Sequence, residues 1–225
     1  MSTEQPGKRA LARAETMRRI TEVGRTQLEQ KGVEGLSLRE VARELGMVSS
    51  AIYRYVASRD ELLTLLLVQA FDELADAVDG DDLAAARRTP ANRFVEVATR
   101  MRIWAIGHRA QWALLYGTPV PGYAAPAEQT TGPGTRVFGR FAEIAAAAQP
   151  TGGTKVSRRL SPVLDAAATE LGVTADPAAM AVGATLWSSV TGAITAELFT
   201  QWGPDVDTVG EEFFALQLGV LANLL

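Results

Sequence analysis

The sequence predicts an all-α protein of about nine to ten helices, arranged as a small N-terminal domain and a larger C-terminal domain. Nearly every segment carries the apolar periodicity of a helix, and none alternates as a β-strand does. Helix caps recur along the chain, with Ser, Thr or Asp before a helical segment and Gly after it. With 225 residues, 47% of them hydrophobic, the chain can build a real core.

The N-terminal third is predicted to form three helices after a disordered leader, residues 1–8. The first runs over about 9–30, where Lys31-Gly32 ends it. Its candidate inward side chains are Leu11, Ile20, Val23 and Leu28.

The segment 36–61 predicts a helix-turn-helix. Ser37 and Glu40 form a capping box for a helix that begins at Leu38, in which the Ser hydroxyl accepts a backbone N–H and the Glu side chain reaches back. Gly46 supplies the positive φ of the turn. The residues expected to face a common core are Val41, Ala42, Leu45, Met47 and Ile52.

Two further caps complete this segment. Ser49 and Ser50 are candidate N-caps for a second helix over 51–56. Ser58 and Glu61 form another capping box, which opens a helix to about Val78.

The remaining 160 or so residues, by this periodicity, continue as helices. A break is expected at 79–81, a long structured loop or lid at the Pro- and Gly-rich segment 117–135, and a linker at Gly152-Gly153. Thr89 and Pro90 mark an N-cap and first turn. The expected helices are 90–106, whose shared face is Phe94, Val97, Met101 and Trp104, then 108–116, 135–148, 158–171, 177–201 and 206–224.

Charge is distributed unevenly although the net charge is only −4. Residues 1–62 contain 11 Lys and Arg against 9 Asp and Glu, a net charge of +2, whereas residues 63–225 contain 11 against 17, a net charge of −6. The positive excess therefore coincides with the helix-turn-helix, which favours contact with DNA. The lack of cysteine excludes disulfides and thiolate metal sites, and the N-terminal segment lacks the apolar core of a secretion signal, so a cytoplasmic protein with no membrane span is expected.

Candidate DNA contacts follow from the motif. The start of the first motif helix can hold a phosphate, and the second can present hydroxyl, methyl, phenol and guanidinium groups to base edges. Tyr53 and Tyr55 have packing as an alternative role, Ser37 is first a cap, and Arg18, Arg19 and Arg43 are assigned to solvated faces. The predicted DNA-binding residues are Ser37, Leu38, Arg39, Val48, Ser49, Ser50, Ala51 and Arg54, to which the resemblance described next adds Tyr53, Tyr55 and Arg59.

An N-terminal helix, the segment GLSLREVARELGMVSSAIYRYVASRDELL and a helical remainder closed by a two-helix hairpin together resemble the TetR family of bacterial transcriptional regulators. The C-terminal part resembles a subclass with an aromatic His segment, here Trp104 to His108, and a Trp-x3-His-Gly motif, in which Thr191 replaces the His. The resemblance implies that residues 9–58 bind DNA and that 59–225 bind a ligand and dimerise. It also implies that the second motif helix enters the major groove, and that Arg59 grips phosphate where the family commonly has Lys.

An aromatic set in the second domain suits a concave, largely apolar site for a small-molecule effector. The alternative is that these rings are core, which fits Met101 and Phe94 best. The predicted ligand-binding residues are Met101, Trp104, His108, Trp112, Tyr116, Tyr123, Phe138, Phe141, Trp187 and Thr191. His108 is the sole histidine, so a site of several imidazoles is excluded, and no metal or cofactor is expected.

The final hairpin is predicted to form the dimer interface. Its candidate residues are Leu186, Val190, Ile194, Leu198, Phe213, Phe214, Leu216 and Val220. The expected function is that of a homodimeric repressor on a near-palindromic double-stranded operator, released by an apolar or aromatic effector. The alternative is a helical ligand-binding protein or enzyme with a vestigial DNA-binding domain. No catalytic residue is assigned, because no nucleophile elbow or phosphate-loop spacing is present.

Overall fold

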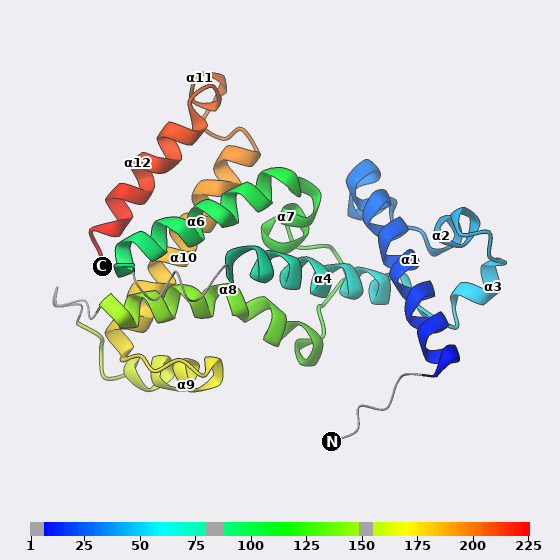
Figure 1. The fold of residues 1–225 in the computed structure, drawn as a ribbon, viewed down its shortest axis with the longest axis horizontal. Helices are drawn as coiled ribbons and strands as arrows, with labels where there is room; N and C mark the ends of the chain where they lie inside the picture. The colour runs from blue at the N-terminus through cyan, green and yellow to red at the C-terminus, as the bar shows by residue number, and fades with distance from the viewer. Residues whose placement is uncertain (1–6, 80–87, 149–154) are drawn as a thin grey trace.

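The computed structural model describes residues 7–79, 88–148 and 155–225, and this part of the chain contains eleven α-helices and no strand. Two of the helices have only four residues, α3 (Ser49–Ile52) and α11 (Pro204–Asp207). Figure 1 shows two lobes, a small one built around α1 and a larger one that contains both α6 and the C-terminus. The all-α prediction is confirmed.

The small lobe contains α1 (Lys8–Lys31), the 3₁₀ turn η1 (Val33–Gly35), α2 (Leu38–Glu44) and α3. Its core joins these elements to the first turns of α4 (Arg59–Asp79). All five predicted inward residues of the motif lie where expected, with Val41, Ala42 and Ile52 buried and with Leu45 and Met47 packed against them. Leu11 is the exception in α1, because it is 55% exposed.

The capping predictions hold only in part. The Ser37 hydroxyl accepts the Glu40 N–H at 3.4 Å, and Gly46 has φ +67° as predicted. The second motif helix differs, because it begins at Ser49, with Val48 as N-cap and no side-chain cap, and ends at Ile52. The chain from Tyr53 to Tyr55 continues as turns rather than as helix.

At α4 the Ser58 hydroxyl accepts the Glu61 N–H at 3.1 Å, as a capping box requires. The Glu61 carboxylate, however, accepts the N–H of Ala57 rather than that of Ser58. The helix then runs out of the small lobe to Asp79, so it belongs to both lobes (Figure 1).

The large lobe packs α6 (Pro90–Gly107), α7 (Arg109–Tyr116), α8 (Ala127–Ala148), α9 (Ser161–Leu171), α10 (Pro177–Leu198) and α12 (Gly210–Ala222) around the C-terminal half of α4. Thr89 caps α6 through the Asn92 N–H, with Pro90 in the first turn, as predicted. The expected last helix is divided into α11 and α12. The predicted break at 79–81, the Gly152-Gly153 linker and most of the leader lie outside the described residues.

The predicted loop over 117–135 is wrong in its second half, since α8 begins at Ala127 and continues through Pro133. Proline cannot donate to the carbonyl four residues back, which normally interrupts a helix. The hydroxyls of Thr130 and Thr135, on either side of Pro133, donate to the carbonyls of Pro126 and Thr131. Gly134 then lets α8 approach Phe71 of α4, whose ring atoms would lie 3.3 Å from a Cβ.

Candidate nucleic-acid interface and effector cavities

The helix α3 presents a mainly polar surface to solvent. Val48 is 70% exposed and Tyr53 is 47% exposed, while Ser49, Ser50 and Arg54 are exposed as well. Ile52, on the opposite side, is fully buried and anchors the helix to α2. Five of the predicted DNA-contact residues thus share one accessible surface.

Four other predicted contacts are less available. Leu38 is only 5% exposed and belongs to the core, so it cannot touch a base or phosphate through its side chain. Tyr55 is half-buried beneath the Arg13 guanidinium, 5.2 Å from the ring centre, and Ala51 is half-buried. Arg59 donates to the carbonyl of Val33 at 2.6 Å, so part of its hydrogen-bonding capacity serves the fold.

Arg13 is a residue that the sequence analysis missed. Besides covering Tyr55, it donates to the carbonyl of Arg54 at 3.2 Å. These contacts fix the turn that follows α3 to the long helix α1, although 41 residues separate Arg13 from Arg54. The clue in the sequence was an arginine preceding the motif, but its spacing alone gave no reason to choose it over Arg18 or Arg19.

The start of α2 is held by a network that differs from the predicted box. The Ser37 N–H donates to Gln27 Oε1 at 3.0 Å, and the Glu40 carboxylate pairs with Lys31 at 2.6 Å instead of reaching back. The Lys31 ammonium lowers the pKa of Glu40 through this hydrogen bond. Arg39, in the same turn, is exposed.

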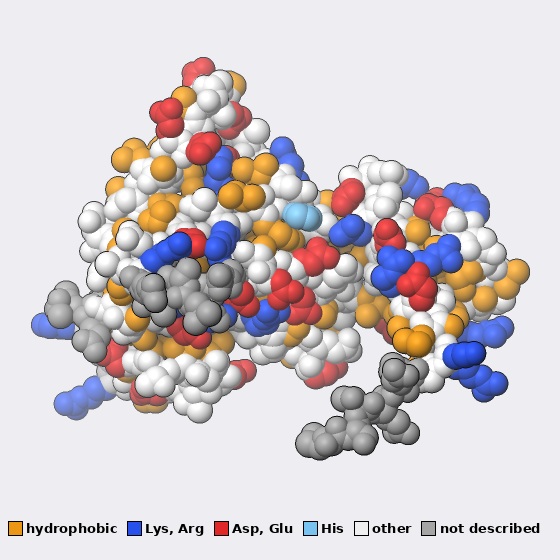
Figure 2. Space-filling model, in the orientation of Figure 1, with side chains coloured by type: hydrophobic (Ala, Val, Ile, Leu, Met, Phe, Trp, Pro, Cys, Tyr) orange, Lys and Arg blue, Asp and Glu red, His pale blue; other side chains and the backbone are white. Residues whose placement is uncertain are grey.

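Figure 2 shows Lys and Arg side chains spread over the lobe that carries α1 to α3, particularly toward its outer end. Acidic side chains lie among them, in keeping with the modest net charge of +2 for residues 1–62. The salt bridges of Arg18 with Glu15 and Glu22 lie on a solvated face of α1, where the hydrogen bond from Arg18 lowers the pKa of Glu15. A surface of this charge attracts phosphates without being strongly basic.

The aromatic set of the large lobe divides into core residues and a partly accessible group. Met101, Trp112 and Phe141 are fully buried, and Phe141 packs edge-to-face on Phe94, so these three of the predicted ligand residues are core. Trp104 is 7% exposed and stacks on His108, with ring centres 4.7 Å apart. The His108 Nδ1 lies 2.8 Å from the Trp104 carbonyl, which can only accept, so Nδ1 carries the proton.

Two buried hydroxyls in this lobe have no hydrogen-bond partner, those of Tyr116 and Thr191. Burial raises the pKa of Tyr116, so its hydroxyl is neutral at physiological pH. The Tyr116 ring contacts Trp112, Trp187 and Phe71, and Trp187 in turn meets Phe138. Tyr116, Phe138 and Trp187 therefore form one aromatic group, and Thr191 lies one helical turn after Trp187 in α10.

Tyr123 lies elsewhere than predicted. Its hydroxyl is hydrogen-bonded to Thr64 Oγ1 at 2.9 Å, and its ring packs against the core of the small lobe. The loop 117–126 is thereby fastened to α4, so Tyr123 connects the lobes rather than lining the aromatic group.

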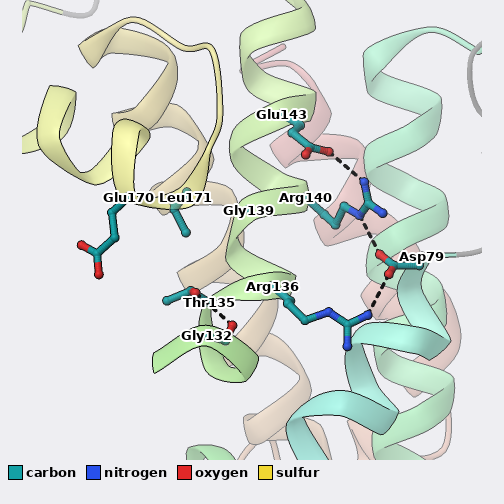
Figure 3. A pocket seen from close by; sticks show the side chains of 9 residues that line it. All are labelled: Asp79, Gly132, Thr135, Arg136, Gly139, Arg140, Glu143, Glu170 and Leu171. Atoms are coloured by element: carbon teal, nitrogen blue, oxygen red, sulfur yellow. Dashed lines mark hydrogen bonds and ion pairs between the residues drawn. The ribbon is translucent and has the colours of Figure 1, made fainter. Parts of the chain in front are cut away.

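A cavity of about 400 Å³ lies between α8, α9 and the end of α4 (Figure 3). Arg140 bridges Asp79 at 2.6 Å and Glu143 at 3.0 Å, and Arg136 binds Asp79 at 3.1 Å. Arg136 also pairs with Asp72 and Asp76, and these contacts raise the pKa of both arginines. The guanidinium groups of Arg136 and Arg140 are engaged with carboxylates of α4 and with Glu143 of α8, so this cluster fastens α4 to α8.

The predicted dimer residues separate by exposure. Leu186, Val190 and Ile194 are fully buried within one chain, and Leu198 and Phe214 are each 5% exposed, so these five pack in the core and have little surface left for a partner. Leu216 and Val220 are 64% and 63% exposed. With the half-buried Phe213 they border an apolar groove of about 350 Å³, whose other lining residues are Ser189, Ala193, Gln217 and Leu221.

The helix α10 is long and apolar enough to cross a membrane by length and composition alone. Its buried residues line the core of the large lobe, as in many core helices, so this is weak evidence of a span. Among the residues that the structure describes, no three His, Asp or Glu side chains are grouped as metal ligands.

Comparisons with known proteins agree with this arrangement. Residues 20–66 match the model of bacterial regulatory proteins of the tetR family, and residues 94–221 match that of a tetracyclin repressor-like C-terminal domain. The chain is 44% identical over 226 residues to the HTH-type transcriptional regulators Rv1816 of Mycobacterium tuberculosis and Mb1846 of Mycobacterium bovis, covering 97% of this chain and 96% of each relative.

Solved structures show the same fold. The crystal structure of the putative regulatory protein SCO4313 has a TM-score of 0.75 at 27% identity, over 96% of this chain and 98% of that one. Mycobacterium smegmatis BioQ has a TM-score of 0.54 at 19% identity, over 91% of this chain and 94% of that one. The relatives are transcriptional regulators and two TetR family models match most of the sequence, so the chain belongs to the TetR family of bacterial transcriptional regulators.

Proposed function

We propose that the protein is a homodimeric cytoplasmic repressor, which binds a near-palindromic operator and releases it when a small apolar or aromatic effector binds. The observation that carries the proposal is the exposed face of α3, because its side chains make the groups that read DNA available to an outside partner. Ser49 and Ser50 can bond phosphates or base edges, Tyr53 can bond a phosphate, and Arg54 can reach guanine.

A dimer would place two such surfaces on one face of DNA. Leu216 and Val220 lie one turn apart on α12 and expose large apolar side chains beside the groove of Phe213 and Ala193. A second copy of the chain is the occupant we assign to this face, because a two-fold interface buries the same apolar patch twice. Two recognition helices about 34–36 Å apart then meet successive major grooves, which requires two-fold symmetric half-sites.

The effector is assigned to the aromatic group of the large lobe. The buried, unpartnered hydroxyls of Tyr116 and Thr191 each forgo hydrogen bonding worth roughly 1–3 kcal/mol, which a ligand with a polar group could recover. The rings of Trp187 and Phe138 suit an apolar or aromatic body.

Selection of duplexes from a random library with the purified protein tests the DNA proposal. We expect enrichment of a near-palindrome whose half-site centres are one helical turn apart. Enrichment of no sequence above background would contradict it and would favour a ligand-binding protein with a vestigial DNA-binding domain.

Light scattering of the variant Leu216→Glu tests the dimer. We expect a monomer, because a carboxylate cannot be buried unpaired at the centre of an apolar interface. Val163→Glu is the matched control, because Val163 is 61% exposed on α9. The Val163→Glu protein should remain a dimer. A dimeric Leu216→Glu protein would remove α12 from the interface.

A further inference from the structure

The two lobes meet at a cleft of about 630 Å³, which shares Tyr116 with the aromatic group of the large lobe but none of its other residues. One wall is the end of α1 with η1, represented by Leu28 and Val33. The floor is one face of α7, where Ala110, Ala113 and Tyr116 are spaced three residues apart. In Figure 1 α7 lies between the body of the large lobe and α1.

The other wall is the end of α10, with Thr195, Phe199 and Gln201. Phe199 is 39% exposed, which is high for a phenylalanine. Thr200, between Phe199 and Gln201, has φ +54° and is the one non-glycine residue in the described ranges with positive φ. The chain therefore holds a costly backbone conformation where it presents these two side chains to the cleft.

The composition of the cleft restricts what can bind. None of its lining residues carries a charged side chain, and the polar ones are Tyr116, Thr118, Thr195 and Gln201. Two arginines lie beside the walls, where Arg59 donates one N–H to Val33 O and Arg109 donates one to Leu198 O. These hydrogen bonds hold both side chains against the backbone of the walls, and neither arginine lines the cleft.

The space itself depends on small residues on the floor and rim. The short side chains of Ala110 and Ala113 leave open space above the middle of α7. Gly117 cannot be replaced by a residue with a side chain, since a Cβ there would lie 2.3 Å from Ala113 O. A volume of this size is typical of drug-sized ligands, whereas a stable protein partner would need a much larger surface.

We propose that this interlobe cleft is a binding site for an uncharged, largely apolar small molecule with an aromatic ring. Tyr116 and Phe199 supply the ring contacts, and the Gln201 amide and Thr118 hydroxyl supply the polar ones. A molecule bound there touches both the DNA-binding domain, at Leu28 and Val33, and the regulatory domain. It therefore fixes the position of one domain relative to the other. The resulting change in operator binding rests on the proposed function.

Cysteine protection locates the site, because the natural chain has no cysteine and single thiols report without interference. The neutral naphthalene dye prodan is the probe, and methyl methanethiosulfonate is the thiol reagent. We expect prodan to slow modification of Gln201→Cys and Thr118→Cys several-fold. It should leave Thr169→Cys, an exposed control on α9, unchanged.

Filling the cleft provides the second measurement. Ala113→Leu, on the full-length protein, is expected to weaken prodan binding by about tenfold or more. Ala166→Leu, at an exposed position of α9, is the matched control and should bind like wild type. Equal protection at Thr169→Cys, or wild-type prodan affinity in Ala113→Leu, would overturn the site.

The regulatory consequence is measured separately. Saturating prodan should change the affinity for the selected duplex at least threefold, and the duplex should change prodan affinity by the same factor. No change in either would overturn the coupling while leaving the site in place. Failure to bind any duplex specifically would instead refute the proposed function, since cysteine protection is measured without DNA.

Discussion

Replacing Gly183 by alanine is expected to destabilise the protein, because α10 crosses α8 at this glycine without room for a methyl group. A Cβ at Gly183 would lie 2.8 Å from the Cα of Ala142 and 3.0 Å from its backbone N. Both atoms belong to the backbone of α8, so no side chain can rotate away. One of the two helices must move, and the packing around Leu186 and Phe141 moves with it.

The magnitude can be worked from two opposing terms. Overpacking a well-filled contact costs about 1–3 kcal/mol. The better helix propensity of alanine offsets this cost by about 1 kcal/mol in the free energy of unfolding. Gly139→Ala is a matched control, since Gly139 is buried in α8, one turn before Ala142, and a Cβ there meets nothing within 4 Å. The control gains the propensity term alone, so the two variants should differ by about 1–3 kcal/mol in the free energy of unfolding.

Thermal unfolding followed by circular dichroism, at one protein concentration for both variants, measures this difference. For a chain of this size it corresponds to melting temperatures about 2–12 °C apart, with Gly183→Ala the lower. A Gly183→Ala protein as stable as Gly139→Ala would refute the reasoning that the helix crossing has no space.

Three further predictions concern hydrogen bonds between or within the lobes. Arg102 binds Glu197 through two hydrogen bonds of 2.6 and 2.8 Å, so Glu197→Gln should lower the free energy of unfolding by about 2–3 kcal/mol in urea titrations. The double variant Glu197→Gln, Arg102→Met should recover part of this loss, because it leaves no unpaired charge. Equal losses in the single and double variants would contradict the prediction. The Lys31 contact lowers the pKa of Glu40 in the folded protein below its ordinary value of 4.5. The stability that wild type has over Glu40→Gln should therefore be fully present above pH 4.5 and be lost as the pH falls through the pKa of Glu40 in the folded protein. A stability difference that persists in acid would point to another cause. Tyr123→Phe removes the hydrogen bond to Thr64, so it should lower the free energy of unfolding by about 1 kcal/mol and speed hydrogen exchange in residues 117–126. Unchanged exchange in this loop would show that other contacts hold it.

Much of the fold follows from signals local in the sequence. Ser37, Gly46, Ser58 and Thr89 each act through neighbours within a few residues, so their roles as caps and turn are correctly predicted. Pro133 shows the limit of this approach, because α8 continues through it and packs on Phe71 of α4 at Gly134, a contact that no local pattern reveals.

The candidate sites were harder to predict, because an apolar helix face does not say which neighbour covers it. Leu186 and Val190 belong to the same kind of stripe as Leu216 and Val220, yet the first pair is buried in its own chain and the second is exposed. Arg13 and Tyr123 act on residues 41 and 59 positions away, at distances set only by folding. The interlobe cleft likewise assembles three segments that are far apart in the sequence.

The central claim is that the exposed face of α3 reads DNA sequence, and fluorescence anisotropy with the selected duplex and a scrambled duplex tests it most directly. Arg54→Ala and Tyr53→Ala should each weaken binding to the selected duplex by about 1–3 kcal/mol, while folding and dimerisation stay intact. Arg158→Ala, an exposed arginine of the large lobe, should bind as wild type does. Wild-type affinity and discrimination in both α3 variants would contradict the account.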